Sequence, residues 1–170
     1  VRRVIEAAPS LGVGTLTLYA FSSDNWKRPA AEVSGLFSLL KDFLVRETGE
    51  LIRRGVRFSA IGRRDRLDPV LVELIGEAEA ATKACSALHL RVAIDYSSRD
   101  ALLAAVRKGA ATREDISRLL GGVPDVDVLL RTGGEKRLSD FLHWESAYAE
   151  LFFTSTARPD LSIGGLGSFV

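Results

Sequence analysis

The spacing of apolar residues changes repeatedly along the chain, and each spacing predicts one type of element. Short runs of branched and aromatic residues are typical of strands, and they occupy 15–20, 56–61, 87–94 and 126–130. Elsewhere apolar residues recur at steps of three and four, which is typical of helices, over 1–8, 30–54, 68–84, 99–108 and 113–120. Strands that alternate with helices form a mostly parallel sheet with helices on both faces. The pattern therefore predicts an α/β fold, built as a single domain over residues 1–170.

The last of these apolar runs ends in a loop that carries basic residues and glycines. Arg131 and Arg137 bracket Gly133 and Gly134, and Ser139 follows at an expected helix N-terminus. Ligands bind at the carboxyl edge of parallel strands, and arginine forks and free N–H groups suit a diphosphate. A solvated turn in which Ser139 only caps a helix has the same spacing. Spacing alone leaves both readings open.

A second polar loop, 21–29, follows the strand at 15–20. Hydroxyls, an amide and an arginine crowd into it, as recognition of a diphosphate beside a reacting carbon requires. The alternative is a polar turn in which Asn25 bonds its own backbone. Because both loops leave the carboxyl ends of parallel strands, we expect Asn25 and Arg28 to face Arg131 and Arg137 in one pocket.

Composition limits the classes of function. Of the 170 residues, 46% are hydrophobic and 26% are charged, as in an ordinary soluble globular protein. Because 23 basic residues nearly cancel 22 acidic ones, we expect no nucleic-acid partner. A single cysteine, Cys85, excludes an internal disulfide, and no apolar run approaches the roughly 20 residues of a membrane span. We therefore expect a cytoplasmic protein.

Three segments together carry a resemblance to a known family. The segments 16–29 (LTLYAFSSDNWKRP) and 129–154 resemble the cis-prenyltransferases, the undecaprenyl diphosphate synthase family of isoprenyl transferases. The segment 88–107 is also similar, although the family's usual Asn-Tyr-Gly-Gly-Arg reads Asp-Tyr-Ser-Ser-Arg at 95–99. The resemblance implies cis-condensation of isopentenyl diphosphate with an allylic diphosphate, such as farnesyl diphosphate, to give a Z-polyprenyl diphosphate. It further implies Mg²⁺ as cofactor, a homodimer, and contact with a membrane for product release.

The resemblance also implies roles for individual residues. Asn25 corresponds to the residue implicated in removing the proton during condensation. A neutral amide is a poor base, so we expect Asn25 to orient a water or a diphosphate oxygen that takes the proton. Asp24 stands where the family commonly has glutamate, which keeps the charge and shortens the side chain. The implied substrate contacts are Ser22, Ser23, Asp24, Trp26, Arg28, Arg131, Arg137, Leu138 and Ser139.

Glu150 opens an apolar run, where a charge is costly unless it is paired. An ion pair with Arg131 or Arg137 would satisfy it. The resemblance instead implies that this glutamate binds Mg²⁺, and magnesium's preference for carboxylate oxygen agrees.

The family pattern extends past both ends of this sequence, and it also covers a long helix. Relative to the family we expect the first sheet strand, an Asp-Gly-Asn-Gly-Arg-Trp loop with a metal-binding aspartate, and a carboxyl-terminal tail to be absent. The alternative function is thus a non-catalytic or truncated homologue that binds diphosphate or a partner subunit without turnover. The helix at 33–51 is expected to wall a hydrophobic product tunnel, unless it only packs in the core. Ala20 is small, which favours a medium or long product.

Overall fold

A computed structural model of the chain describes residues 2–156, which form two compact units. One unit, called here the sheet unit, is Ile5–Tyr96. The other, called here the loop unit, begins at Ser97 and also includes the first residues of the chain.

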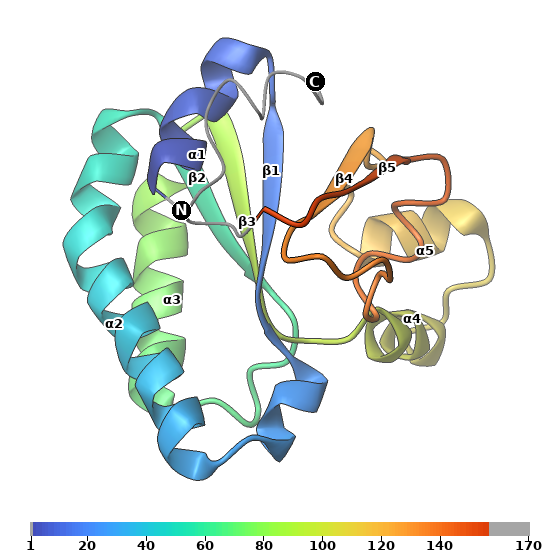
Figure 1. The fold of residues 1–170 in the computed structure, drawn as a ribbon, viewed down its shortest axis with the longest axis horizontal. Coiled ribbons are helices and arrows are strands. Elements are labelled where there is room, and N and C mark those ends of the chain that lie inside the picture. The colour runs from blue at the N-terminus through green and yellow to red at the C-terminus, as the bar shows by residue number, and fades with distance from the viewer. Residues whose placement is uncertain (1, 157–170) are drawn as a thin grey trace. The chain divides into compact units, whose positions relative to one another are not determined.

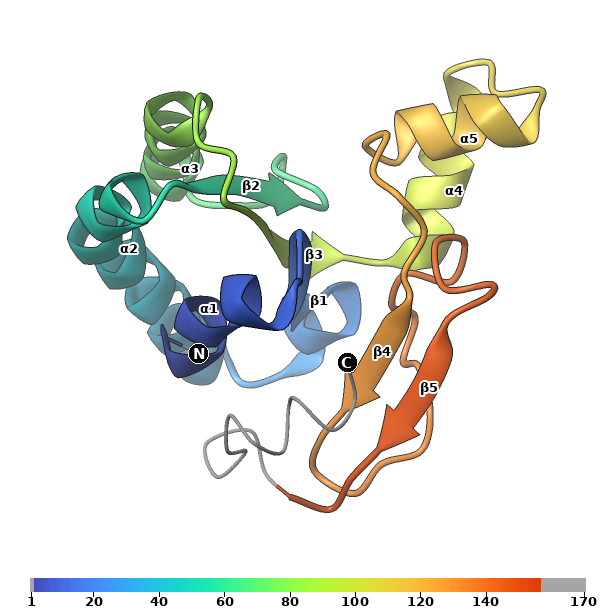
Figure 2. The same cartoon turned by 90° about the horizontal axis from the view of Figure 1, so that it is seen from above.

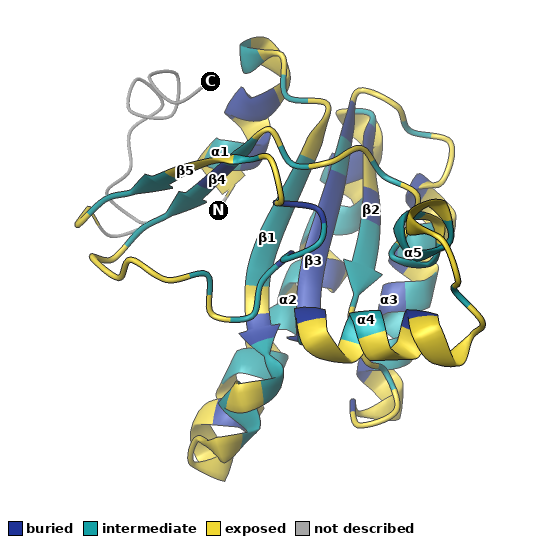
Figure 3. Cartoon of the chain, turned by 90° about the vertical axis from the view of Figure 1, so that its right-hand side faces the viewer, coloured by how far each residue is buried: buried dark blue, intermediate teal, exposed yellow. Residues whose placement is uncertain are grey.

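The sheet unit is organised around three parallel strands in the order β1-β3-β2. They are β1 (Thr15–Ser22), β2 (Val56–Ile61) and β3 (Leu88–Tyr96). β2 pairs with β3 in even register from Val56↔Leu88 to Ile61↔Ala93, whereas the β1 pairing is irregular between Tyr19 and Ser22. β3 lies in the middle and is buried along most of its length, as Figure 3 shows. The prediction of an α/β fold with a parallel sheet is confirmed.

Two long helices cover one face of this sheet. They are α2 (Ala30–Arg53) and α3 (Pro69–Thr82), which pack side by side against the strands (Figure 1). Figure 2, seen from above, shows both helices on the same side. The strands turn alternate residues toward them, because side chains on a strand point to opposite faces in turn. The core consists largely of these alternating residues and the facing helix residues: Leu44, Leu51, Val56, Phe58, Leu71, Ile75, Leu88 and Leu90.

The helix boundaries between residues 2 and 82 follow local signals. α1 (Arg2–Ala7) continues into a 3-10 helix, η1 (Ala8–Leu11), which ends at Gly12 with a φ of 76°. That left-handed conformation costs glycine little and stops helices. Asp68 caps α3 by accepting a hydrogen bond from the Val70 N–H at 2.8 Å, and Pro69 occupies the first helical position. The expected helix start at 68–69 is confirmed.

The loop unit contains two short helices and two short strands. They are α4 (Ser98–Arg107), α5 (Arg113–Leu119), β4 (Val128–Arg131) and β5 (Glu150–Phe153). β4 and β5 are parallel and pair from Val128↔Glu150 to Arg131↔Phe153. Thr112 and Asp115 form a capping box at α5, and the hydrogen bond from Arg118, followed by backbone N–H donors, lowers the pKa of Asp115 to about 2.

One expected element does not form. Ser139 does not lie at a helix N-terminus, because 139–149 consists of turns and bends. Ser139, Asp140 and Leu142 all have positive φ angles, which a right-handed helix does not permit. The polar side-chain atoms at 139 and 140 form hydrogen bonds with other segments instead of capping a helix. The Asp140 carboxylate accepts from the Ser97 hydroxyl at 2.5 Å and from the Arg99 N–H at 3.1 Å.

No helix within residues 2–156 is both long enough and apolar enough to cross a membrane.

Candidate active site

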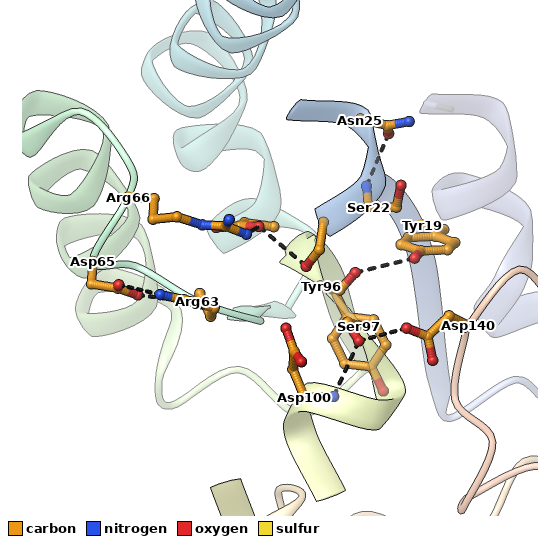
Figure 4. Close-up of polar contacts among 12 residues, drawn as sticks. Tyr19, Ser22, Asn25, Arg63, Asp65, Arg66, Tyr96, Ser97, Asp100 and Asp140 are labelled. Carbon is orange, nitrogen blue, oxygen red and sulfur yellow. Dashed lines mark hydrogen bonds and ion pairs between the residues drawn. The ribbon is translucent and has the colours of Figure 1, made fainter. Parts of the chain in front are cut away.

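The sheet unit places a tight turn directly at the carboxyl end of β1. Ser23–Lys27 forms a short 3-10 helix, η2, and Ser22 and Asn25 form a capping box across its start. The Ser22 N–H donates to Asn25 Oδ1 at 2.9 Å. Because a backbone N–H can only donate, this bond fixes which end of the amide is oxygen. Figure 4 shows the consequence: the Asn25 oxygen faces the Ser22 N–H, and the amide nitrogen, which carries two N–H donors, points away from Ser22.

This geometry bears on both readings of Asn25. The polar-turn reading is correct in that the amide oxygen bonds the local backbone. The amide nitrogen, however, is not used by that bond. It presents donors, which suit the oxygens of a diphosphate, rather than an acceptor suited to removing a proton.

Trp26 anchors the turn by packing against apolar neighbours. Its ring lies 5.3 Å from that of Phe21 and 5.4 Å from that of Phe37, measured between centroids. Phe21 and Phe37 are themselves 4.8 Å apart, so the three rings form one cluster. The Trp26 indole N–H is buried and has no hydrogen-bond partner in the part of the chain that the structure describes.

The charged residues of this turn lie at its surface. Asp24 and Lys27 form an ion pair at 2.7 Å with both side chains largely exposed, and the Lys27 ammonium lowers the pKa of Asp24. Arg28 pairs with Glu32 in the first turn of α2, and both side chains are 48% exposed. The Ser23 hydroxyl points inward instead and donates to the Asp95 carboxylate at 3.3 Å.

The arginine and glycine loop follows β4 in the loop unit. Arg131 Nη1 donates to the Ser139 hydroxyl at 2.6 Å and also to the Arg137 carbonyl, so this side chain ties the two ends of the loop together. Gly133 and Gly134 have φ angles of 88° and 83°. Their N–H groups donate to the Thr156 and Thr154 carbonyls at 3.1 and 2.9 Å.

The remaining predicted residues of this loop lie at or near its surface. Arg137 forms an ion pair with Glu135, and its side chain is 66% exposed. Ser139 is also exposed, whereas Leu138 is partly covered. The structure thus brings Arg131, Arg137 and Ser139 together in one loop. The predicted pocket shared with Asn25 and Arg28 stays a prediction.

Glu150, which opens the apolar run noted in the sequence, is the first residue of β5 and is exposed. Its N–H donates to the Asp127 carbonyl at 2.8 Å. Within residues 2–156 its carboxylate forms no ion pair with Arg131 or Arg137, so the ion-pair reading of this position is not realised there. An exposed carboxylate suits Mg²⁺, which commonly takes one or two carboxylates together with substrate phosphates and waters. The described residues contain no group of three or more His, Cys, Asp or Glu side chains that would hold a metal unaided.

Sequence reasoning missed two residues that reach the first turn. Asp95 is fully buried at the end of β3, and Arg66 holds its carboxylate with two hydrogen bonds. One signal was available, because position 95 departs from the family's usual asparagine. No periodicity pointed to Arg66, which lies in an irregular segment before α3.

The parallel sheet, the polar turn after its first strand and the arginine loop are features of the prenyltransferase class predicted from the sequence. Comparisons with known proteins give the family. The family model described as "Putative undecaprenyl diphosphate synthase" matches residues 1–168. The chain therefore belongs to the undecaprenyl diphosphate synthase family.

Relatives of high similarity are isoprenyl transferases. Isoprenyl transferase 1 of Bradyrhizobium diazoefficiens is 55% identical over 98% of this chain and 70% of that protein. An isoprenyl transferase of Aquifex aeolicus is 45% identical over 94% of this chain and 72% of that protein. The function predicted from the sequence, cis-prenyl transfer by an enzyme, is confirmed, and a non-catalytic homologue is not favoured.

Two solved structures share the fold. A probable undecaprenyl diphosphate synthase from Campylobacter jejuni has a TM-score of 0.92 at 35% identity, over 98% of this chain and 83% of that one. Lavandulyl diphosphate synthase from Lavandula x intermedia, solved with dimethylallyl diphosphate, has a TM-score of 0.92 at 30% identity, over 98% and 78%.

Proposed function

We propose that this chain condenses isopentenyl diphosphate with an allylic diphosphate, such as farnesyl diphosphate, to give a Z-polyprenyl diphosphate. In this reaction the allylic carbon–oxygen bond breaks and the diphosphate leaves with the electron pair. The double bond of isopentenyl diphosphate then forms the new carbon–carbon bond, and one proton is lost. The protein has to hold two diphosphates and stabilise the charge that builds on the leaving group.

The orientation of the Asn25 amide carries the proposal. Its oxygen is occupied by the Ser22 N–H, so the side chain offers two N–H donors at the carboxyl edge of the sheet. We assign these donors to a diphosphate oxygen, or to a water, that accepts the proton released in the condensation. Ser22, Ser23, Asp24, Trp26 and Arg28 complete this side of the substrate site.

The arginine loop is assigned to isopentenyl diphosphate. Arg131 and Arg137 are fixed relative to each other, since Arg131 donates to the Arg137 carbonyl. The Arg137 guanidinium remains largely exposed and is therefore accessible to a ligand. Ser139 adds a hydroxyl, and Leu138 stands between Arg137 and Ser139 in the sequence. A planar fork that donates two parallel hydrogen bonds matches diphosphate oxygens better than a point charge does.

We assign Mg²⁺ to Glu150, in company with substrate phosphates and waters. The support is the exposure of the carboxylate and the lack of an ion pair to either loop arginine within residues 2–156. When bound, Mg²⁺ would neutralise charge on the diphosphate leaving group.

We further propose a homodimer whose contact lies near 148–153. Tyr148 and Leu151 support this assignment, because they are 89% and 46% exposed although both are large and apolar. A cytoplasmic location, with membrane contact for product release, completes the proposal. Light scattering at micromolar concentration tests the dimer, and a monomer at that concentration would remove this contact.

The product tunnel is also part of the proposal. The core-packing reading of 33–51 accounts for Val33, Leu44 and Leu51, which are buried. Leu36, Phe37, Leu40 and Phe43 are only partly buried against the core, and they supply an apolar surface for a growing chain. Ala20 lies in β1, two residues before the strand ends at Ser22, and its small side chain leaves room for a medium or long product.

The direct test is product analysis. The enzyme that contains this chain is incubated with magnesium, radiolabelled isopentenyl diphosphate and farnesyl diphosphate, and the products are separated by chromatography. Z-polyprenyl diphosphates longer than the primer are expected. Unextended primer under conditions in which the protein is folded would overturn the proposal.

A further inference from the structure

Asp95 is a buried charge at the point where three segments of the sheet unit meet. It is 0% exposed, and its backbone φ is 49°, in the left-handed region that aspartate tolerates better than most residues. Arg66 Nε donates to Asp95 Oδ2 at 2.9 Å and Arg66 Nη2 to Oδ1 at 2.5 Å. A buried carboxylate requires such a partner, because an unpaired charge is strongly unfavourable in the protein interior.

The same carboxylate holds the proposed catalytic turn. The Ser23 hydroxyl, at the start of η2, donates to Asp95 Oδ1 at 3.3 Å. The Asp95 carbonyl meanwhile accepts the Arg63 N–H at 3.1 Å. Asp95 therefore links the end of β3 both to the turn after β1 and to the segment after β2.

Arg66 contacts the turn a second time through its planar face. Its guanidinium carbon lies 5.6 Å from the centre of the Trp26 ring, close enough for a cation–π contact. Figure 4 shows the Arg66 side chain extending from the segment before α3 toward the region of η2. One face of Trp26 is thus covered by Arg66, while Phe21 and Phe37 pack against the ring.

The segment that carries Arg66 is fixed against β3 by a glycine. Gly62 has a φ of 118°, and a Cβ at this position would lie 2.1 Å from the Ile94 carbonyl oxygen. Only glycine permits this approach. The backbone that leads to Arg66 is therefore packed closely against β3. The position of Arg66 is set by β3, so its side chain can fix the position of η2.

From this arrangement we infer that Arg66 and Asp95 are positioning residues for prenyl transfer, which hold η2 so that the Asn25 amide faces the substrate. The inference rests on the proposed function of η2. Neither residue is assigned a contact with substrate. The Asp95 carboxylate accepts both arms of the Arg66 fork, one on each oxygen, whereas an amide would accept only through its single oxygen.

The test separates positioning from simple stabilisation with a double substitution. Arg66→Met leaves the buried Asp95 charge without its partner, so we expect both a lower unfolding temperature and a turnover number lower by about 100-fold, as for a displaced catalytic group. Adding Asp95→Asn removes the unpaired charge. The double variant should regain most of the unfolding temperature and little of the turnover. If turnover returns together with stability, the role is structural and the inference fails.

Two further variants sharpen the result. Arg66→Lys keeps the charge but neither the fork nor the planar face, so it should recover only part of the turnover. Arg64→Met is the matched control, since Arg64 lies in the same segment but donates to Glu79 at 2.6 Å and to the Ala60 carbonyl at 3.2 Å. It should keep the turnover number. An Arg66→Met turnover equal to that of Arg64→Met would overturn the inference.

A spectroscopic readout distinguishes failure of the inference from failure of the proposed function. The 170 residues contain two tryptophans, Trp26 and Trp144, so in a background in which every tryptophan of the enzyme except Trp26 is replaced by phenylalanine the fluorescence reports Trp26 alone. Removing Arg66 should shift the emission maximum and raise quenching by acrylamide, while Arg64→Met should change neither. An unchanged spectrum contradicts the positioning role. If the Arg66 variants shift the spectrum but Asn25 variants keep the parental turnover, the positioning role stands and the assignment of η2 to catalysis is contradicted.

Discussion

The two loops assigned to substrate are held in different ways. The turn at 23–27 is fixed by buried contacts, which include the cluster around Trp26 and the carboxylate of Asp95. The loop at 131–139 is exposed along most of its length and is tied mainly by the Arg131 side chain and by hydrogen bonds of its own backbone. A substitution near the first should therefore change both folding and catalysis. A substitution in the second should mainly change ligand use.

The largest expected contrast is between Gly62, in the segment that carries Arg66 to the first turn, and Gly133, in the second loop. Gly62→Ala places a Cβ 2.1 Å from the Ile94 carbonyl oxygen, so the strands or the segment must move. We expect it to lower the free energy of unfolding by about 3 kcal/mol or more. Gly133→Ala meets no atom within 4 Å and has only the cost of a positive φ, about 1 kcal/mol. Urea unfolding of both variants measures the difference, and equal losses would mean that Gly62 does not fix its segment.

Arg137→Ala should weaken the use of isopentenyl diphosphate without affecting folding. We expect the transition-state free energy to rise by about 2 to 4 kcal/mol, the range for losing one side of a charged hydrogen-bonded contact with a ligand. The unfolding free energy should stay within about 0.5 kcal/mol because the side chain is largely exposed. The measurement is kcat/KM for isopentenyl diphosphate, with Arg137→Lys expected to recover only part. An unchanged kcat/KM would remove Arg137 from the site.

The smallest expected contrast is in the response to acid. In the sheet unit, burial and the charges of Arg57 and Arg91 lower the pKa of His89 from 6.5. As the pH falls, His89 therefore takes up a proton at a higher pH in the unfolded chain than in the folded one. The stability contributed by neutral His89 is intact above about pH 6.5 and decreases below it. In the loop unit the pKa of Asp115 is lowered to about 2 from 3.8, so its contribution is intact above about pH 4 and is lost as the pH falls toward 2.

Replacing each residue with one that does not titrate tests whether His89 and Asp115 control these two pH ranges. His89→Gln should flatten the pH dependence of unfolding just below pH 6.5 and leave the more acidic range alone. Asp115→Asn should remove the contribution of Asp115 above about pH 4, seen as faster hydrogen exchange in α5 near neutral pH, and should flatten the pH dependence only between about pH 4 and 2. A His89→Gln protein with the original slope between pH 5 and 6.5 would show that another group is responsible.

Much of the fold follows from the sequence because local signals agree with the tertiary structure. The strand expected at 56–61 forms with those bounds, since Gly55 and Gly62, both at positive φ, delimit it. β3 extends two residues past its predicted end. No pattern of apolar residues indicates that extension, because Asp95 is buried only by virtue of its pairing with Arg66.

The candidate site was less predictable where polar atoms have distant partners. Ser139 looks like a helix cap in sequence, but its hydroxyl accepts from Arg131 and the next carboxylate binds Ser97. These hydrogen-bond partners are distant in the sequence: Arg131 is 8 positions from Ser139, and Ser97 is 43 positions from Asp140. Asn25 was correctly placed after a strand. Which end of its amide faces outward is decided by the Ser22 N–H, a detail that composition and spacing do not contain.

The most direct test of the account concerns that amide. Asn25→Asp keeps the size of the side chain and an oxygen for the Ser22 N–H, but it replaces the two outward N–H donors with a second carboxylate oxygen. The measurement is incorporation of labelled isopentenyl diphosphate by the enzyme that contains this chain, beside Lys27→Gln as a control in the same turn. We expect Asn25→Asp to unfold like the parent protein and to lose about 100-fold or more in turnover. An Asn25→Asp enzyme with parental turnover would contradict the claim that this side chain acts as a donor to the diphosphate.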